Sequence, residues 1–191
     1  MNIIIAGVGG QGAVLASHLL GRAAMSSGLA VRGSETIGMA QRGGSILSHV
    51  RIGSGACSPT IRIGQADSIL AFELCEAARA LPYLKQGGAL VACDAAIQPA
   101  GSLHGYDRRE MADYLKLAAK NIFLLDSALV DEKCGARCLN VALLGAAASR
   151  KAIPFSAYDL EKALRGKFSG EAAEMNVKAL RFGAMLAESM S

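Results

Sequence analysis

The six residues GVGGQG, at positions 7–12, constrain the fold of this 191-residue chain more than any other stretch. The apolar run NIIIAG, at 2–7, is typical of a buried parallel strand. Residues 11–26 have helical spacing, with one face made of Val14, Leu15, His18, Leu19 and Ala23. A second short strand is expected at Leu29–Arg32, so the chain opens as a strand, a glycine loop, a helix and a strand.

The glycine loop fits the G-x-G-x-x-G pattern of dinucleotide-binding folds. Its small residues permit a tight turn, and the free N–H groups and helix dipole at 10–13 favour an anion. An NAD site also needs an acidic residue at the end of the second strand, where Arg32 and Gly33 stand. Glu35 is expected beyond that strand, in the next loop. An arginine at the strand end, such as Arg32, would instead suit a 2′-phosphate. The pattern therefore leaves two interpretations open, a nucleotide or phosphate site and a structural turn.

The stretch GMAQRGGSILSHVRIG, at 38–53, is unusually polar and rich in glycine. Such loops commonly bind ligands when rigid elements hold them in place. Arg42, followed by two glycines, can present its guanidinium to a carboxylate or phosphate. Residues 45–52 alternate in polarity and predict a strand, with 58–64 as the second arm of a hairpin across a turn at 53–56. An ordinary solvated hairpin is the alternative interpretation.

The rest of the chain alternates between strands and helices, and its last third is helical. Strands are expected at 67–72, 88–94 and 120–127, and helices at 73–84, 108–119, 136–150, 156–165 and 171–188. Pro154 separates two of these helices, and Ser156 is suited to cap the second. We predict one domain, residues 1–191, with a three-layer, Rossmann-like α/β fold. Its sheet is mostly parallel, with an inserted β-hairpin and a helical carboxyl-terminal third.

Composition and charge exclude several classes of function. The net charge is +4 without a run of basic residues, and only 5% of residues are aromatic, which argues against nucleic-acid binding. No apolar stretch approaches the roughly 20 residues of a membrane span. The cysteines are odd in number and irregularly spaced, as in a reduced, cytoplasmic protein without a secretory leader. They are Cys57, Cys75, Cys93, Cys134 and Cys138.

No set of side chains in the sequence has the spacing of a metal or iron–sulfur site. Cys134 and Cys138 form C-x3-C rather than C-x2-C-x2-C, and the histidines lack metal-ligand spacing. His18 is expected to pack in the core or at an interface. His49 and Glu35 are the candidates for a catalytic role, since histidine transfers protons near neutral pH.

The sequence resembles the gamma-domain family of 2-oxoacid:acceptor oxidoreductases at two stretches, GVGGQGAVLASHLLGRAA and GSETIGMAQRGGSILSHVRIG. The resemblance continues through ADSILAFELCEAARALPYLKQGGALV and covers nearly the whole chain. GMAQRGGS resembles the branch that contains the beta subunits of indolepyruvate:ferredoxin oxidoreductases.

The resemblance implies a reaction and a division of labour. Members of the family oxidatively decarboxylate a 2-oxoacid with coenzyme A, giving an acyl-CoA, carbon dioxide and reduced ferredoxin. Thiamine diphosphate with Mg²⁺, and [4Fe–4S] clusters, would lie on a larger alpha subunit, because this chain has no G-D-G stretch and no cysteine cluster. The chain would bind no cofactor firmly and would complete a hetero-oligomer, with a homodimer as an option for the isolated chain.

The resemblance leaves two roles open for this chain: it borders the active site, or it helps to hold coenzyme A, whose phosphates suit the glycine loop or Arg42. The candidate cofactor-binding residues are Gly7, Gly9, Gly10, Gln11, Gly12, Gln41, Arg42, Gly43, Gly44 and Ser45, and no metal ligand is expected. The partner would read substrate shape, so indolepyruvate, phenylpyruvate and other acids stay open. Two other functions also stay open: a free-standing NAD(P)-dependent oxidoreductase, and a non-catalytic binding module in which the glycine loop is only a turn.

Overall fold

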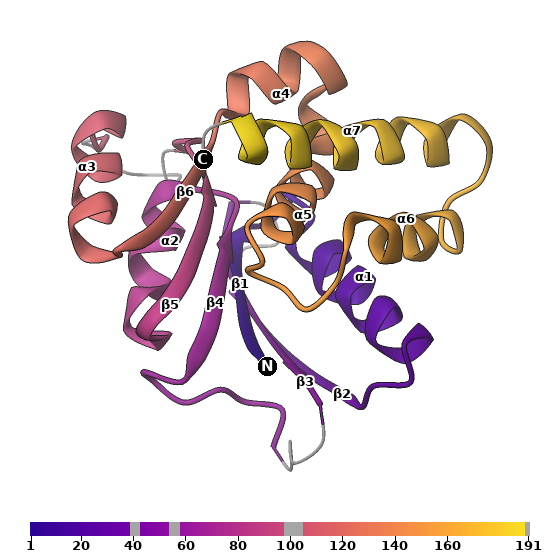
Figure 1. The fold of residues 1–191 in the computed structure, drawn as a ribbon. Helices are drawn as coiled ribbons and strands as arrows, with labels where there is room; N and C mark the ends of the chain where they lie inside the picture. The colour runs from indigo at the N-terminus through magenta and orange to yellow at the C-terminus, as the bar shows by residue number, and fades with distance from the viewer. Residues whose placement is uncertain (39–42, 54–57, 98–104, 190–191) are drawn as a thin grey trace.

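The computed structural model describes residues 1–38, 43–53, 58–97 and 105–189, which form a mixed sheet between two layers of helices (Figure 1). The strands are β1 (Asn2–Val8), β2 (Val31–Ile37), β3 (Ser45–Ile52), β4 (Ala66–Ala71), β5 (Leu84–Cys93) and β6 (Asn121–Leu125). The helices are α1 (Ala13–Ser26), α2 (Leu74–Ala80), α3 (Arg108–Ala118), α4 (Ser127–Cys134), α5 (Leu139–Ser149), α6 (Ala157–Arg165) and α7 (Gly170–Ser189). Short 3₁₀ turns, η1 (Leu81–Tyr83) and η2 (Ala136–Cys138), precede β5 and α5. The predicted three-layer α/β class is confirmed.

The strand order β2-β3-β1-β4-β5-β6 places a crossover point between β1 and β4. After β1 the chain builds β2 and β3 on one side, and it then builds the remaining strands on the other. β4, β5 and β6 run parallel to β1, whereas β3 runs antiparallel to both β1 and β2. In α/β proteins, the crevice beyond the carboxyl ends of the strands at such a point is the usual ligand site.

The inserted hairpin exists, but its second arm differs from the prediction. β3 pairs with β2 on one edge and with β1 on the other, so neither edge is free for residues 58–64. That segment forms no strand, and Pro59 lacks an N–H for a ladder. It is held by buried Ile61, whose N–H donates to His49 Nδ1 (3.1 Å). Most of the predicted turn at 53–56 lies outside the described residues.

β2 lies further along the chain than the predicted strand at Leu29–Arg32. Glu35 therefore sits within the strand, opposite Ser48 of β3, and not in the following loop. Arg32 lies near the start of β2 rather than at its end. The polar sequence of this segment hid the strand, because strand preference depends largely on the ladder partner.

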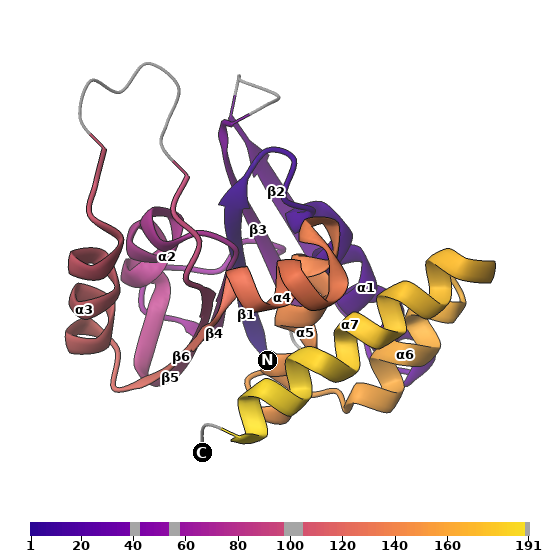
Figure 2. The ribbon, with the colours of Figure 1, turned by 90° about the horizontal axis from the view of Figure 1, so that it is seen from above.

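The sheet separates two apolar cores. Ile3 and Ile5 of β1 face the core under α1 and α5, while Ile4 faces the core under α2. All three side chains are fully buried, which confirms β1 as a buried strand. Figure 2 shows α2 and α3 on one face of the sheet and α1, α5, α6 and α7 on the other.

Two glycines allow α5 and α7 to cross with their backbones in contact. A Cβ atom on Gly145 would lie 1.9 Å from the Leu180 carbonyl oxygen, and one on Gly183 would lie 1.9 Å from the Ala142 carbonyl oxygen. Because α5 is buried along nearly its whole length, this crossing anchors the carboxyl-terminal helices to the rest of the domain.

The sequence pattern does not predict α4, which Asp126 caps by accepting from a backbone N–H.

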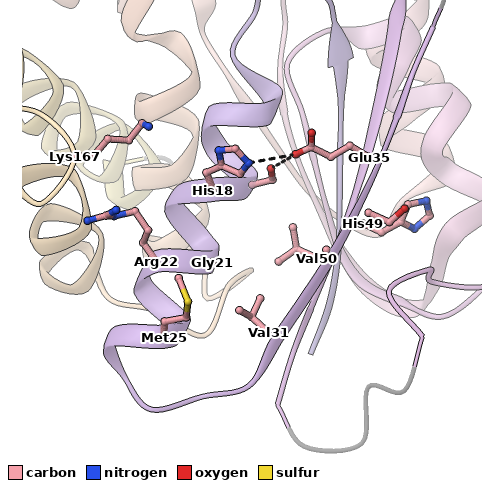
Figure 3. Close-up of a pocket in the computed structure, with 12 residues that line it drawn as sticks. His18, Gly21, Arg22, Met25, Val31, Glu35, His49, Val50 and Lys167 are labelled. Carbon is pink, nitrogen blue, oxygen red and sulfur yellow. Dashed lines mark hydrogen bonds and ion pairs between the residues drawn. The ribbon is translucent and has the colours of Figure 1, made fainter.

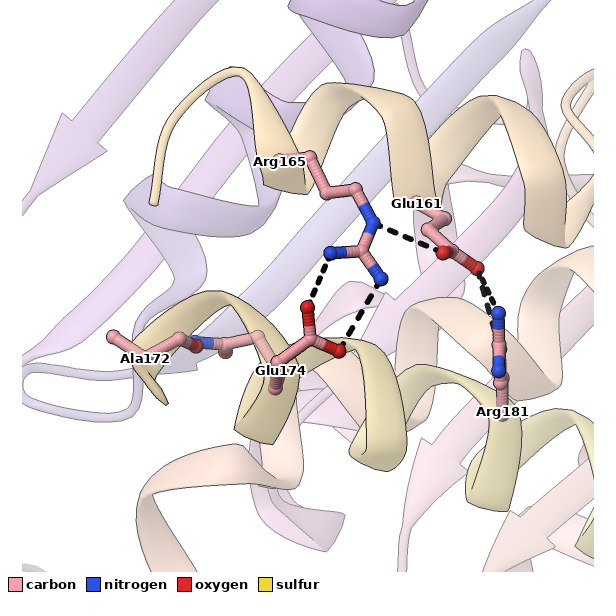
Figure 4. Close-up of polar contacts among 6 residues, drawn as sticks. Glu161, Arg165, Ala172, Glu174 and Arg181 are labelled. Carbon is pink, nitrogen blue, oxygen red and sulfur yellow. Dashed lines mark hydrogen bonds and ion pairs between the residues drawn. The ribbon is translucent and has the colours of Figure 1, made fainter. Parts of the chain in front are cut away.

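α6 and α7 are joined at the surface by an ion-pair network. Ser156 caps α6, as predicted, and forms a capping box with Asp159. Glu161 accepts from Arg165 (3.1 Å) and from Arg181 (2.8 Å), and Arg165 also pairs with Glu174 (Figure 4). The hydrogen bonds from Arg181 and Arg165 lower the pKa of Glu161. Such exposed pairs orient the two helices but contribute little stability each.

Candidate functional site

Gln11 joins the carboxyl ends of β1 and β4 at the crossover point. Its Oε1 accepts from the Val8 N–H (2.9 Å), and its Nε2 donates to the Phe72 carbonyl oxygen (2.9 Å). Its own backbone N–H donates to the Val8 carbonyl oxygen (3.1 Å). The side chain therefore bridges the crevice in which α/β folds usually hold a phosphate. Gln11 occupies one of the unspecified positions of the G-x-G-x-x-G fingerprint, and its side chain spans this crevice.

The glycines of the loop have separate roles. Gly12 (φ +81°) precedes α1, and a Cβ atom there would lie 2.1 Å from Asn140 Nδ2, so α5 packs directly against the loop. Gly10 (φ +101°) is exposed, with open space where its Cβ would lie. α1 has no side-chain cap and no acidic residue in its first turn, but Ala13 is fully buried. The positive end of α1 is thus reachable mainly from the side of Gly10.

The second glycine-rich segment lies directly against the first. The Gly9 N–H donates to the Gly44 carbonyl oxygen (2.8 Å), and the Gly43 N–H donates to the Gly9 carbonyl oxygen (3.4 Å). Ser45, the first residue of β3, pairs in register with Val8 at the end of β1. The fold therefore brings both segments to one edge of the sheet, called the carboxyl edge below. It comprises Gly9–Gly12, Gly43–Ser45 and the acidic residues described next.

Two buried carboxylates follow β4 at the carboxyl edge. Glu76 accepts from Ser45 Oγ (2.5 Å) and from the Arg79 guanidinium (2.8 Å). Glu73 caps α2 by accepting from the Glu76 N–H (2.8 Å), and burial raises the pKa of Glu73. These groups line a pocket of about 30 Å³ with Gly43, enough for about one water molecule. Ser45 is therefore fixed to α2 as well as to β1.

The prediction from sequence did not include Glu73 and Glu76. Their signal is the string FELCE, in which two acidic residues, three positions apart, directly follow a buried strand. That arrangement is typical of a helix start at the carboxyl end of a strand. Gln41 and Arg42, two of the predicted cofactor-binding residues, lie outside the described residues.

Glu35 and His49 lie on opposite faces of the sheet (Figure 3). Glu35 accepts from Ser17 Oγ (2.7 Å), and one of its oxygens is 3.9 Å from His18 Nε2. The His49 ring points away from them, is buried, and accepts from the Ile61 N–H. Burial lowers the pKa of His49. The structure does not bring the two predicted catalytic candidates together.

Of the two predicted places for His18, the core is wrong, because its side chain is 61% exposed, whereas an interface stays a prediction. The buried face of α1 is rotated away from His18, toward a stripe that includes Ala16, Leu20 and Ala23. Small side chains on this stripe let α1 approach the sheet closely. The apolar residues Val14 and Leu15 pack at the margin of the same core.

Within the described part of the chain, no three His, Cys, Asp or Glu side chains are arranged to hold a metal ion. The described cysteines are free thiols, and burial raises the pKa of Cys93 and of Cys138. Cys57 lies outside the described residues. None of the helices seen in the described ranges is both long and apolar enough to cross a membrane.

The carboxyl edge differs from an NAD(P) site in two ways. Gln11 spans the crevice at the crossover point, and antiparallel β3 lies beside β1 where dinucleotide folds place their second parallel strand. The ribose-binding acidic residue at the end of that second strand therefore has no counterpart beside β1. The fold and the site define a Rossmann-like α/β domain whose crossover point is bridged by its own side chain.

Comparison with known proteins identifies the family. The family model described as pyruvate ferredoxin/flavodoxin oxidoreductase matches residues 2–186. The indolepyruvate oxidoreductase subunit IorB of Archaeoglobus fulgidus is 35% identical over 96% of this chain and 93% of its own length. The common gamma subunit of the pyruvate/ketoisovalerate oxidoreductases of Pyrococcus abyssi is 28% identical over 92% of this chain and 90% of its own length.

A solved structure has the same fold. The crystal structure of pyruvate oxidoreductase subunit PORC from Thermotoga maritima has a TM-score of 0.70 at 21% identity, covering 97% of this chain and 95% of that chain. The chain therefore belongs to the pyruvate ferredoxin/flavodoxin oxidoreductase family. This confirms the family and the oxidoreductase class that the two glycine-rich segments imply.

Proposed function

We propose that residues 1–191 form the gamma-type domain of a thiamine diphosphate-dependent 2-oxoacid:ferredoxin oxidoreductase of the indolepyruvate type. In the complete enzyme the bond to the carboxylate of an aryl 2-oxoacid breaks and carbon dioxide leaves. The acyl group is joined to the sulfur of coenzyme A as the thiol proton is released, and the two electrons set free reduce ferredoxin. The relationship to an indolepyruvate oxidoreductase subunit along nearly the whole chain carries this proposal.

The indolepyruvate branch is supported over the pyruvate branch by two observations. The chain is 35% identical to the indolepyruvate relative and 28% identical to the pyruvate/ketoisovalerate relative, over similar shares of their lengths. The stretch GMAQRGGS, at 38–45, resembles the same branch. We therefore propose an aryl 2-oxoacid as the substrate of the complex, with its shape read mainly by the partner.

We assign thiamine diphosphate, Mg²⁺ and the [4Fe–4S] clusters to a larger alpha subunit. The described residues of this chain do not fit these groups, because they provide no metal-binding set and because Cys93 and Cys138 are both buried. On the partner, thiamine diphosphate would supply the carbanion chemistry and the clusters would carry electrons. The free thiols of the described cysteines agree with the cytoplasmic location that we include in the proposal.

The carboxyl edge is the surface that we propose to face the partner and coenzyme A. Gly10, Gly43 and Ser45 are exposed there, and Gly43 directly follows Arg42 in the sequence. Gln11 holds β1 to β4, and Glu76 holds the start of β3 to α2, so the exposed backbone is rigidly presented. Backbone N–H groups and an arginine suit the phosphates of coenzyme A. The chain thus supplies a positioned surface and leaves the bond-breaking steps to the partner.

Co-expression with the alpha subunit tests this function. The complex should catalyse coenzyme A-dependent reduction of an acceptor dye with phenylpyruvate or indolepyruvate, and neither chain should do so alone. Arg42→Gln should raise the KM for coenzyme A several-fold, whereas the control Arg109→Gln, at an exposed position of α3, should leave it unchanged. Full activity of the alpha subunit by itself would refute the proposed role of this chain.

A further inference from the structure

A groove with a volume of about 540 Å³ separates α1 from the edge strand β2 (Figure 3). The α1 wall is a stripe of residues three or four positions apart, formed by His18, Gly21, Arg22 and Met25. The β2 wall includes Val31, Gly33 and Glu35, which alternate along the strand and so share one face. The size falls within the range of pockets that bind small molecules.

Two glycines, one on each wall, keep the groove open. Gly21 lies inside α1, where glycine is less favourable than any other residue except proline. A Cβ atom on Gly21 would meet no atom within 4 Å, so no packing contact requires a glycine there. On Gly33 it would lie 3.5 Å from the His49 carbonyl oxygen, an ordinary contact. Neither glycine has a positive φ, so the backbone conformation does not require a glycine at either position. What the two glycines share is the open space that a missing side chain leaves in the groove.

The charged side chains at the two ends of the groove differ in sign and in their partners. At one end, the Glu35 carboxylate accepts from Ser17 Oγ and lies near His18. Toward α6, Arg22 donates to the Gly166 carbonyl oxygen (2.9 Å), and Lys167 adds a second cation to the lining. Among the described residues, neither cation forms an ion pair with a carboxylate. This side of the groove therefore favours an anion.

Apolar side chains complete the lining between the charged ends. Met25, Val31 and Val50 contribute to the groove, and Met25 is 63% exposed. An exposed methionine beside a glycine-lined space provides an adaptable contact surface for an apolar group. The groove thus combines two cations with an apolar surface, at a place distinct from the carboxyl edge.

We propose that this groove binds a small amphipathic carboxylate. Its carboxylate pairs with Arg22 and Lys167, and its apolar body lies against Met25, Val31 and Val50. The site does not depend on the partner subunit or on the reaction proposed above. Neutral and cationic analogues of the same shape lose the pairing with the two cations and bind more weakly.

Titration of the isotope-labelled full chain with 3-phenylpropionate, followed by NMR, tests the proposal. We expect saturable shifts for residues of α1 and β2, with a Kd of about 1 mM for a ligand of this size. The matched amide and the matched amine, 3-phenylpropanamide and 3-phenylpropylamine, should each bind about tenfold more weakly. No saturation by the carboxylate, or tighter binding of the amine, would overturn the assignment.

Three variants separate this groove from non-specific binding. Gly21→Leu places a side chain in the open space and should abolish the shifts without unfolding the chain, because its Cβ meets no neighbour. Arg22→Gln should weaken binding about tenfold, whereas the exposed control Arg109→Gln should not change it. Unchanged binding by both groove variants would place the ligand elsewhere and refute the proposal.

Discussion

At the scale of single residues, Gln11 determines what the glycine loop can do. Gln11→Leu would leave the Val8 N–H and the Phe72 carbonyl oxygen without their partner. We expect a loss of about 1–3 kcal/mol in the free energy of unfolding, since unpaired backbone groups near the core are costly. The exposed control Gln86→Leu should change it by less than about 0.5 kcal/mol. Equilibrium urea unfolding measures both, and equal values would show that the bridge contributes nothing.

His49 makes stability depend on pH near neutrality. Burial lowers its pKa below the ordinary value of 6.5, so the unfolded chain takes up a proton first as the pH falls. Stability should therefore decrease as the pH falls below about 6.5, with a slope of at most about 1.4 kcal/mol per pH unit. Unfolding of wild type and His49→Gln between pH 7.5 and pH 5.5 should show this slope only in wild type. The exposed His18 serves as control, because His18→Gln should retain the slope.

The residue scale also shows what a sequence pattern can and cannot specify. The tight turn at Gly12 and the cap at Ser156 were predictable, because each follows from local backbone chemistry. The contact of Gln11 with Phe72 was not, because the two residues are 61 positions apart and meet only once β4 lies beside β1. The buried pairing of Ser45 with Glu76 depends on the same long-range arrangement.

At the scale of elements, the crossing of α5 and α7 is the most sensitive packing contact. Gly145→Ala would push a methyl group to 1.9 Å from the Leu180 carbonyl oxygen, so the two helices must separate. We expect a loss of about 3 kcal/mol or more. Gly21→Ala is the matched control, since it also lies inside a helix but has open space, and it should gain about 0.5–1 kcal/mol. Thermal unfolding of both variants checks the contrast, and a stable Gly145→Ala would contradict the backbone contact.

The elements themselves were predictable where their apolar period is strong. β1, β4 and α6 agree closely with the pattern, because their buried residues recur at strand or helix spacing. The predicted hairpin paired residues 45–52 with 58–64, whereas the observed one pairs β3 with β2. The pattern missed β2 because this strand is polar and is stabilised by its ladder with β3 rather than by burial. The same polarity led to a strand predicted too early, at 29–32, which placed Glu35 in a loop.

At the scale of the whole molecule, one edge of the sheet gathers residues from distant parts of the chain. The crossover point brings the loop after β1, the start of β3 and the start of α2 together. The resemblance to a family predicted the enzyme class, but the connections that bind these segments to one another required the fold. The segments tied together in this way present a rigid surface, in agreement with the role that we propose for the chain.

Titration of the purified alpha subunit with this chain tests the central claim most directly. The rate of coenzyme A-dependent dye reduction with phenylpyruvate should rise from near zero and reach a plateau at equal amounts of the two chains. NAD⁺ and NADP⁺ should not replace the dye as electron acceptor, and NADH and NADPH should not bind to this chain. A rate that is already maximal without this chain, or that does not change when it is added, would contradict the account.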